Sequence, residues 1–487
     1  MPSKLFVPLN RSVRRRLGRV ACVSSAAALL CSCTSMAPPL ERAALPVPQQ
    51  YTQSDGADAV PWSGLSWDQY FNDPVLRQLI AQALLNNRDV RVAQARVREA
   101  QAQYGVQKAD QWPSLTGQAS MTRARTPADL NITGMPLVGS QYQVGVGMAS
   151  WELDFWGRVS SLRDAALDSY LATDAALQAV SLSMITQVAQ AYLNLLELDE
   201  RIELARQTLR SREESLRIFA RREAVGSASR FNLIQVQTLL SQAQALVAQL
   251  AQSREAQAHV LDVLVGGQAV LPARSGSLDA QIMPGELAAG LPSSLLTSRP
   301  DIIAAEYQLK AAHAQIGVAR AAFFPRIALT SSYGTASSEL DGLFKAGSQS
   351  WSFSPSLSMP LFDHGRNQNN LSLAQARRDI AVAQYEKTIQ VAFKDVADSL
   401  SARVWLQQQL EIADATMASQ LERARLAQLR FDSGATGYLD VLDAQRDLLI
   451  AQQQWVQSKR AVQANRVNLF AALGGGGMRM ATRAAAQ

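Results

Sequence analysis

The stretch Trp351–Arg366, which has the sequence WSFSPSLSMPLFDHGR, alternates in polarity and then changes character at its end. From Trp351 to Leu361, apolar side chains and one proline occupy every second position, and mostly serine fills the positions between. A period of two is typical of a β-strand, in which successive side chains point to opposite faces. Two structures fit: a soluble sheet with its apolar face inward, or a membrane strand with lipid on one side and water on the other. This stretch alone favours the soluble sheet.

The net charge of the chain is concentrated at its N-terminus. The 487 residues leave room for more than one ordinary domain, and they carry a formal net charge of +6. Residues 1–32 contain no acidic residue, and their basic residues are Lys4, Arg11, Arg14, Arg15, Arg16 and Arg19. These six account for the whole excess, so a mature protein without them has no basic surplus with which to bind nucleic acid.

Residues 1–32 are predicted to be a lipoprotein signal peptide. A basic start precedes an apolar core from Val20 to Leu30, which is too short for a membrane-spanning helix of about 20 residues. The sequence LLCSC that follows resembles a bacterial lipobox with Cys33 as the lipidated residue; the alternative is an ordinary signal peptide with incidental cysteines. All three cysteines lie in this segment, so the mature chain would have no disulfide. Residues 33–61 are Pro-rich and predict a lipid-anchored tether.

The chain contains an internal repeat. Residues 89–113 match residues 301–325 at an offset of 212, so that Gly105 corresponds to Gly317. Further on, LDFWGR at 153–158 matches LFDHGR at 361–366 at an offset of 208. The sequence therefore predicts two similar halves, residues 62–280 and 281–477, followed by a flexible tail at 478–487.

Each half is predicted to contain helices, two strands, a very long helix and a return helix, in that order. The strands are expected at 115–125, 141–152, 327–335 and 351–361. The long helices are expected at 157–225 and 366–433, and the return helices at 229–265 and 438–473. The long runs lack proline, and at 1.5 Å per residue the first would extend about 100 Å.

Four strands cannot close a membrane barrel, because the smallest have about eight. An open sheet edge in lipid leaves backbone groups unpaired, at several kcal/mol each. If these strands cross a membrane, neighbouring copies must complete the barrel, with eight strands from two copies or twelve from three. The long helices exceed the roughly 30 Å of a bilayer core and carry charges, which indicates a helical body outside the membrane. The alternative, a filamentous coiled-coil scaffold, leaves the strands unexplained.

Four segments carry a resemblance to a known family. They are YFNDPVLRQLIAQALLNNRDVRVAQARVREAQAQ, LPSSLLTSRPDIIAAEYQLKAAHAQIGVARAAFFPRIAL, PLFDHGR and GATGYLDVLDAQRDLLIAQQQ. These resemble the outer-membrane efflux proteins of the TolC and OprM kind, and more narrowly the lipoprotein subunits paired with resistance-nodulation-division pumps. The resemblance extends from Trp62 to about Gly477. It implies an α+β membrane protein: a homotrimer with a twelve-stranded transmembrane β-barrel, continued by a long α-helical barrel in the periplasm.

The resemblance also implies a function and a location. The protein would be a passive exit duct for small compounds in the cell outer membrane, with a periplasmic adaptor and an inner-membrane pump as partners. Thr34, after the lipidated cysteine, is compatible with transfer to that membrane. The alternatives are a polypeptide secretion duct of the same fold and a structural surface lipoprotein without a pore. No enzyme activity and no cofactor beyond the lipid on Cys33 are expected, because His259, His313 and His364 lie far apart in the sequence.

Two pairs of glycines mark predicted turns and junctions. Gly226 and Gly434 interrupt the long helical runs where the chain must reverse, and glycine tolerates the left-handed backbone that such turns need. By resemblance, these turns are tips at the periplasmic end where an adaptor docks. The predicted barrel-to-helix junctions are marked by Gly157, Arg158, Gly365 and Arg366.

A candidate gate follows the second tip. Asp440, Asp443 and Asp447 recur at spacings that place them on one helix face, and a threefold axis would convert each into a ring of carboxylates. Such rings repel one another and require donors, for which Arg430 and Arg446 are available. The resemblance implies gate roles for Leu439 and Asp443, with Arg430 in the surrounding polar network. Relatives often carry Tyr where this chain has Phe431, so that hydroxyl is missing. The alternative is a solvated charged face.

Overall fold

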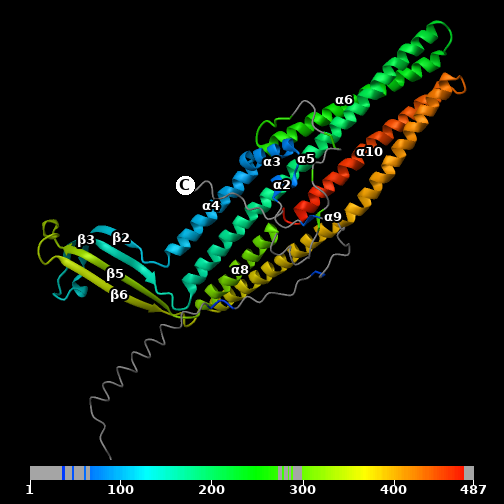
Figure 1. Ribbon diagram of the computed structural model, residues 1–487. Coiled ribbons are helices and arrows are strands. Elements are labelled where there is room, and N and C mark those ends of the chain that lie inside the picture. Colours follow the sequence, from blue (N-terminus) through cyan, green and yellow to red (C-terminus); the bar gives the residue numbers. More distant parts are fainter. Residues whose placement is uncertain are drawn as a thin grey trace, which may run out of the picture. The chain divides into compact units, whose positions relative to one another are not determined.

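The computed structural model describes residues 66–271 and 299–475, together with the short stretches 36–38, 47–48, 60–61, 277–278, 283 and 287–288 (Figure 1). The predicted signal peptide, Cys33, most of the tether and the tail at 478–487 lie outside the described residues, so these assignments remain predictions.

The chain forms two compact units, and each contains parts of both repeats. One unit comprises residues 1–42, 99–171 and 307–383, and the other comprises residues 43–98, 172–306 and 384–487. The repeat boundary near residue 280 is therefore not a domain boundary. The reason lies in the strands, because those of both repeats join a single sheet.

The first unit is built around a four-stranded antiparallel sheet with the order β2-β3-β5-β6. The strands are β2 (Leu115–Thr126), β3 (Leu137–Glu152), β5 (Arg326–Ser337) and β6 (Gln349–Ser358), and short 3₁₀ turns, η1 (Ala128–Leu130) and η3 (Leu340–Gly342), lie in the two hairpin loops. The prediction that the fourth strand reaches residue 361 is wrong. β5 begins at Arg326, whose partner is Ser358, so the later residues have no strand to pair with.

The two faces of this sheet differ in polarity. On one face, Val146 lies opposite Tyr333, which in turn lies opposite Trp351. On the other face, Ser332 and Ser352 share a hydrogen bond of 2.7 Å between their hydroxyl oxygens. Aromatic and aliphatic side chains thus collect on one side, and small polar ones on the other.

A β-bulge in β3 changes the residue offset between β3 and its counterpart in the second repeat, β6. The pairing with β5 shifts between Met148 and Trp151, where Ser150 has a left-handed φ of +44°. Tyr142 pairs with Met121, and the corresponding pair in the second repeat is Trp351 with Tyr333. Upstream of the bulge the offset between β3 and β6 is therefore one residue larger than the offset of 208 at the junction. Without this extra residue, the aromatic side chains of β3 and β6 would point to opposite faces.

The helices make up most of the remaining described chain. Their bounds are α2 Trp67–Tyr70, α3 Pro74–Asn86, α4 Arg88–Ala109, α5 Arg158–Ala224, α6 Arg230–Val265, α8 Pro300–Ala321, α9 Arg366–Asp432 and α10 Tyr438–Ala472. The two longest, α5 and α9, have 67 residues each. The two-residue strands β1 (Val60–Pro61) and β4 (Leu287–Ala288) pair in parallel. None of the described helices combines the length and the apolar character needed to cross a bilayer.

The core of the second unit contains an aromatic cluster. The ring of Tyr70 stacks on Phe470 with centroids 4.3 Å apart, and Phe71 contacts both edge-on. Asp73 caps α3 by accepting from the Val75 N–H at 2.8 Å. Its second oxygen accepts a hydrogen bond of 2.8 Å from the Tyr192 hydroxyl, so the cap also joins α3 to α5.

Two helical hairpins extend from this core. Figure 1 shows α6 beside α5 and α10 beside α9. Asp199 of α5 and Arg254 of α6 form an ion pair of 2.5 Å. Arg201 of α5 donates to the side chain of Gln453 of α10 at 2.5 Å, which links one hairpin to the other.

Candidate functional site

The two hairpin tips have the same backbone geometry. Gly226 and Gly434 have φ values of +74° and +75°, in the left-handed region. In each tip, the N–H of the residue after the glycine donates 2.8 Å to a carbonyl oxygen in the last turn of the long helix. This pattern is a typical helix C-terminus, in which glycine adopts a conformation that other residues reach only with strain. The predicted turns are therefore present at both tips, and their docking role remains a prediction.

The three predicted carboxylates of the second tip have different partners. Asp440 accepts a hydrogen bond from the Thr436 hydroxyl within the turn. Asp443 forms an ion pair of 3.2 Å with Arg446, three residues later on the same helix. Asp447 lies 3.1 Å from Arg446 as well. Asp443 and Asp447 thus form a connected polar cluster with Arg446 along α10, whereas Asp440 is bonded within the turn.

Arg423 joins this cluster from α9, and the sequence analysis did not identify it. Its guanidinium donates to Asp447 at 2.6 Å, across the two helices of the hairpin. This hydrogen bond, with a further contribution from Arg446, holds the pKa of Asp447 below its ordinary value. Arg423 and Asp447 are far apart in sequence, so no local spacing indicates the pair.

Arg430 lies beside two of the predicted carboxylates, and its gate role remains a prediction. Its carbonyl oxygen accepts from the Ala435 N–H in the turn, and its side chain lines a surface pocket together with Asp440 and Asp443. Within the described residues, no carboxylate lies in ion-pair range of Arg430. Leu439 is 42% exposed. The structure therefore brings Arg430 near two predicted carboxylates without pairing it to either.

A cluster on Tyr438 connects the two hairpins near their tips. The Tyr438 hydroxyl shares a hydrogen bond with the Ser215 hydroxyl of α5. Its ring contacts Phe219 and Phe431, with centroid distances of 4.5 and 4.9 Å. Tyr438 thus bonds to α5 through its hydroxyl and packs on Phe431 of α9 through its ring.

Arg212 makes a second link between α5 and α10. It is 3% exposed and donates to the side chain of Gln445 at 2.8 Å. Burial lowers the pKa of Arg212, because a low-dielectric surrounding disfavours the charged form. A buried guanidinium held by a neutral amide is a costly arrangement.

The first barrel-to-helix junction contains a charge cluster. Arg158 donates two hydrogen bonds of 2.7 Å to Glu152, which also forms an ion pair of 2.6 Å with Arg326. Gly157 has a left-handed φ of +68°. Asp154 caps α5, accepting from the N–H of Ser160 at 2.7 Å.

The second junction has a similar backbone and no such cluster. Gly365 has a φ of +81°, and Asp363 caps α9 by accepting from the Asn367 N–H at 3.0 Å. Arg366 is exposed, and the position corresponding to Glu152 is Pro360. The two junctions therefore share the turn and the Asp cap, which the sequence analysis missed, but only the first is cross-linked by charge.

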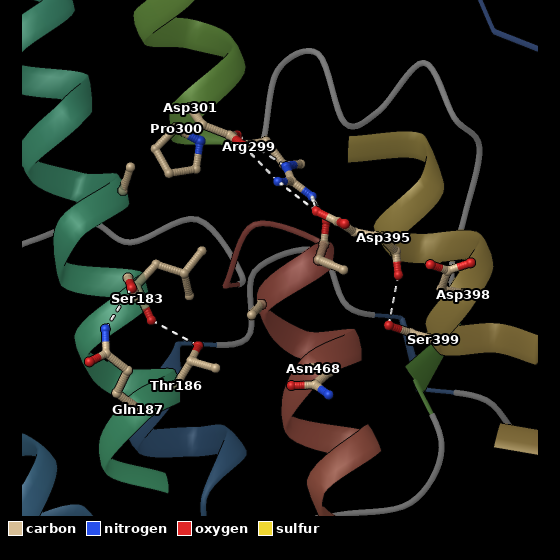
Figure 2. A pocket seen from close by; sticks show the side chains of 14 residues that line it. Ser183, Thr186, Gln187, Arg299, Pro300, Asp301, Asp395, Asp398, Ser399 and Asn468 are labelled. Carbon is tan, nitrogen blue, oxygen red and sulfur yellow. Dashed lines mark hydrogen bonds and ion pairs between the residues drawn. The ribbon is translucent and has the colours of Figure 1, made fainter. Parts of the chain in front are cut away.

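The Arg299 and Asp301 pair of the SRPDI segment lies at a pocket of about 470 Å³ in the second unit. Figure 2 shows Arg299 between Asp301 and Asp395, which it approaches at 2.6 and 3.4 Å. It also donates 3.0 Å to the carbonyl oxygen of Ala472, at the end of α10. Every nitrogen of this guanidinium has a partner, which indicates a structural clamp that holds the start of α8 against α9 and α10.

The arrangement at the tips suits a reversible closure better than a chemical reaction. The ion pair of Arg423 with Asp447, which joins α9 to α10, involves partly exposed side chains and contributes only about 0.2–1 kcal/mol, so it can break and re-form without unfolding the helices. The links from Arg212 and Ser215 to α10 involve buried side chains, so breaking them costs more. Among the described residues, no cluster of three or more acidic, histidine or cysteine side chains is arranged to hold a metal ion.

Comparisons with known proteins cover nearly the whole chain. A sequence profile of the family described as outer membrane efflux protein matches residues 79–267 and 291–475. The chain is similar to the outer membrane protein OprJ of Pseudomonas aeruginosa, with 42% identity over 455 residues that cover 92% of this chain and 94% of OprJ. It is similar to the probable outer membrane lipoprotein SilC of Salmonella typhimurium, with 38% identity over 455 residues that cover 92% of this chain and 96% of SilC.

A solved structure matches the fold. The chain is similar to the open state of the MtrE outer membrane channel of Neisseria gonorrhoeae, with a TM-score of 0.82 and 36% identity. The match covers 91% of this chain and 98% of the MtrE chain. The residues that the family profile matches, 79–267 and 291–475, include the sheet, the long helices and both tips.

Proposed function

The chain belongs to the outer membrane efflux protein family, and on this premise we propose that three copies of it form one passive channel that carries small compounds out of the cell. It is an efflux protein of the outer membrane, as its relatives are. We propose in addition the number of copies, the position of the gate and the partner proteins.

The observation that carries the proposal is the open four-stranded sheet with two unlike faces. β2 and β6 each have one neighbouring strand among the described residues, so the sheet has two unpaired edges. On β6, Trp351 and Phe353 are 72% and 59% exposed on the apolar face. An apolar face suits lipid and the serine face suits a water-filled lumen, and in a membrane both edges require strands from other copies.

The gate would lie at the second tip. A threefold axis through the cluster of Asp440, Asp443 and Asp447 would bring three sets of carboxylates together, with Arg446 and Arg423 limiting their repulsion. Opening would separate the tips, and the links of Tyr438 to Ser215 and of Arg212 to Gln445 would have to change. Both links involve a buried side chain, so breaking either one costs about 1–3 kcal/mol unless the freed groups gain new partners in the open state.

The channel would depend on partners for energy and for contact with the inner membrane. The exposed turns at Gly226 and Gly434 are the proposed docking sites for a periplasmic adaptor, which would connect the channel to an inner-membrane resistance-nodulation-division pump. We propose no catalytic step for this chain, and we place the covalent lipid on Cys33.

The test is conductance in planar lipid bilayers, combined with the mass of the crosslinked complex. We expect a mostly closed pore from the purified lipoprotein, and a crosslinked mass of three chains. A structural lipoprotein without a pore would give no conductance at any protein concentration, and a stable monomer would contradict the shared barrel. A polypeptide duct would conduct, but the complete pump would then leave susceptibility to small toxic compounds unchanged.

A further inference from the structure

The N-terminal segment contacts α8 at a glycine. Gly317 is buried, and a Cβ atom added there would lie 3.0 Å from the amide nitrogen of Ala37 and 3.2 Å from its Cβ. The same added atom would lie 2.8 Å from the hydroxyl oxygen of Ser161 on α5. Glycine at this position therefore leaves room for a backbone segment to lie directly against the helix.

Arg320, one turn later, holds the same segment by a hydrogen bond. Its guanidinium donates to the carbonyl oxygen of Met36 at 3.3 Å. Residues Met36–Pro38 are half-buried, as is Arg320. Gly317 and Arg320 thus contact consecutive residues of the N-terminal segment from one face of one helix.

The other repeat lacks this arrangement. The residues that correspond to Gly317 and Arg320 are Gly105 and Lys108 on α4. Gly105 is exposed, and a Cβ added there would meet nothing within 4 Å. The helix pattern was therefore duplicated, but only the copy on α8 has a segment of chain against it.

We propose that Gly317 and Arg320 form a seat for Met36–Pro38, which fixes the point where the N-terminal tether leaves the body of the protein. Cys33 precedes Met36 by three residues, so it can reach at most about 11 Å beyond the seat. A lipid on Cys33 would thereby stay close to α8. Without the seat, the whole tether could move, and the lipid could reach positions farther from the protein. The seat goes beyond the proposed function, because it requires neither a trimer nor a gate.

The test is a nitroxide spin label at Pro38→Cys in the full-length, membrane-extracted protein. Mass spectrometry would verify one label per chain, since Cys33 is expected to be acylated. We expect a broad, immobilised spectrum in the parent. Gly317→Ala should remove most of the immobilised component, because the added methyl group displaces the Ala37 backbone. Gly105→Ala, the matched control, should leave the spectrum unchanged.

A second variant separates seating from folding. Arg320→Gln adds no bulk and removes the guanidinium, and it should reduce the immobilised fraction several-fold with an unchanged helical circular dichroism signal. Lys108→Gln is its matched control and should have no effect. The proposal is overturned if both Gly317→Ala and Arg320→Gln retain the parent spectrum, or if the control variants mobilise the label to the same extent.

Discussion

At the residue scale, the acidic side chains of the second tip have distinct roles. Asp447 holds Arg423 across the α9–α10 hairpin, so it stabilises the hairpin itself. Asp443 pairs with Arg446 on its own helix and lines the surface pocket beside Arg430. Its side chain is 56% exposed, so it can contact neighbouring copies, whereas Asp447 already holds a partner across the hairpin.

Replacing Asp443 should loosen the closed channel. In Asp443→Ala the constriction loses an acceptor, so we expect more frequent opening of single channels in planar bilayers. Asp379→Ala is a suitable control, because Asp379 is an exposed carboxylate on α9 that is likewise paired with an arginine of its own helix, Arg378, at 2.7 Å. Closed-state leakage equal to that of the parent would contradict a gate role for Asp443.

Asp447 should make the hairpin sensitive to acid. Its pKa is lowered in the folded protein, so its stabilising effect is complete above the ordinary carboxyl value of about 3.9 and is lost as the pH falls through the lower folded value. Asp447→Asn should lower the free energy of unfolding by up to about 1 kcal/mol at pH 7. The difference between variant and parent should shrink toward zero as the pH falls through the lowered pKa of Asp447. Thermal melts followed by circular dichroism would measure it.

The control for this experiment is Asp398→Asn on α9, whose carboxylate lies 2.8 Å from Lys394 with both side chains about two-thirds exposed. We expect a smaller effect there, because no helix other than its own is held. A pH-independent loss of stability in Asp447→Asn would show that the side chain acts through packing and not through charge.

At the scale of single elements, backbone conformation decides where glycine is required. Gly226→Ala and Gly434→Ala should each destabilise the protein by about 1–2 kcal/mol, although nothing lies within 4 Å of the added methyl group. The cause is the left-handed φ at both tips. Gly105→Ala, inside α4 and one turn before its end at Ala109, should instead stabilise by about 0.5–1 kcal/mol. Guanidinium unfolding would show opposite signs, and equal signs would contradict the turn geometry.

The charge cluster of the first junction should have no equivalent in the second. The Glu152 side chain is 9% exposed and holds two arginines, so Glu152→Gln leaves Arg158 and Arg326 without their carboxylate. Because both arginines are partly exposed, we expect a loss of about 1–3 kcal/mol, below the range for fully buried pairs. Arg366→Gln should stay within about 0.5 kcal/mol of the parent. Denaturant unfolding of both variants would measure the contrast.

The sequence indicated the elements more fully than their contacts. Period-two alternation and proline positions predict strands and long helices, because these signals are local. The bulge at Ser150 and the early end of β6 depend on the partner strand, which no single segment specifies. Arg423 with Asp447, and Ser215 with Tyr438, join residues on different helices, so spacing along one helix cannot indicate them.

At the scale of the whole molecule, the strand pairing between the two repeats predicts the strand pairing between neighbouring copies. Within the chain, β3 pairs with β5, and Gly145 lies opposite Gly334. β6 corresponds to β3 in the repeat, and β2 corresponds to β5. By this correspondence, β6 of one copy should pair with β2 of the next, and Ser354 should lie opposite Thr122 of the neighbouring copy.

This register can be tested by disulfide crosslinking. The double variant Ser354→Cys with Thr122→Cys should form crosslinked dimers and trimers on mild oxidation, because the two Cβ atoms would be within bridging distance. Moving the second cysteine to Arg123 places it on the opposite face of the strand, and this control should crosslink weakly. Monomers alone in the first variant, on non-reducing gels, would contradict the predicted pairing.

The two unpaired edges of the sheet also have a consequence for genetics. A chain with four strands cannot close the barrel by itself, so it must assemble with the copies that are present during insertion, defective copies included. A variant with a disrupted β2 edge, produced beside the normal protein, would be incorporated into most of the assembled barrels. Each of those barrels would then contain a strand edge that is not paired. Loss of the edge should therefore be dominant, whereas loss of the whole gene product should be recessive.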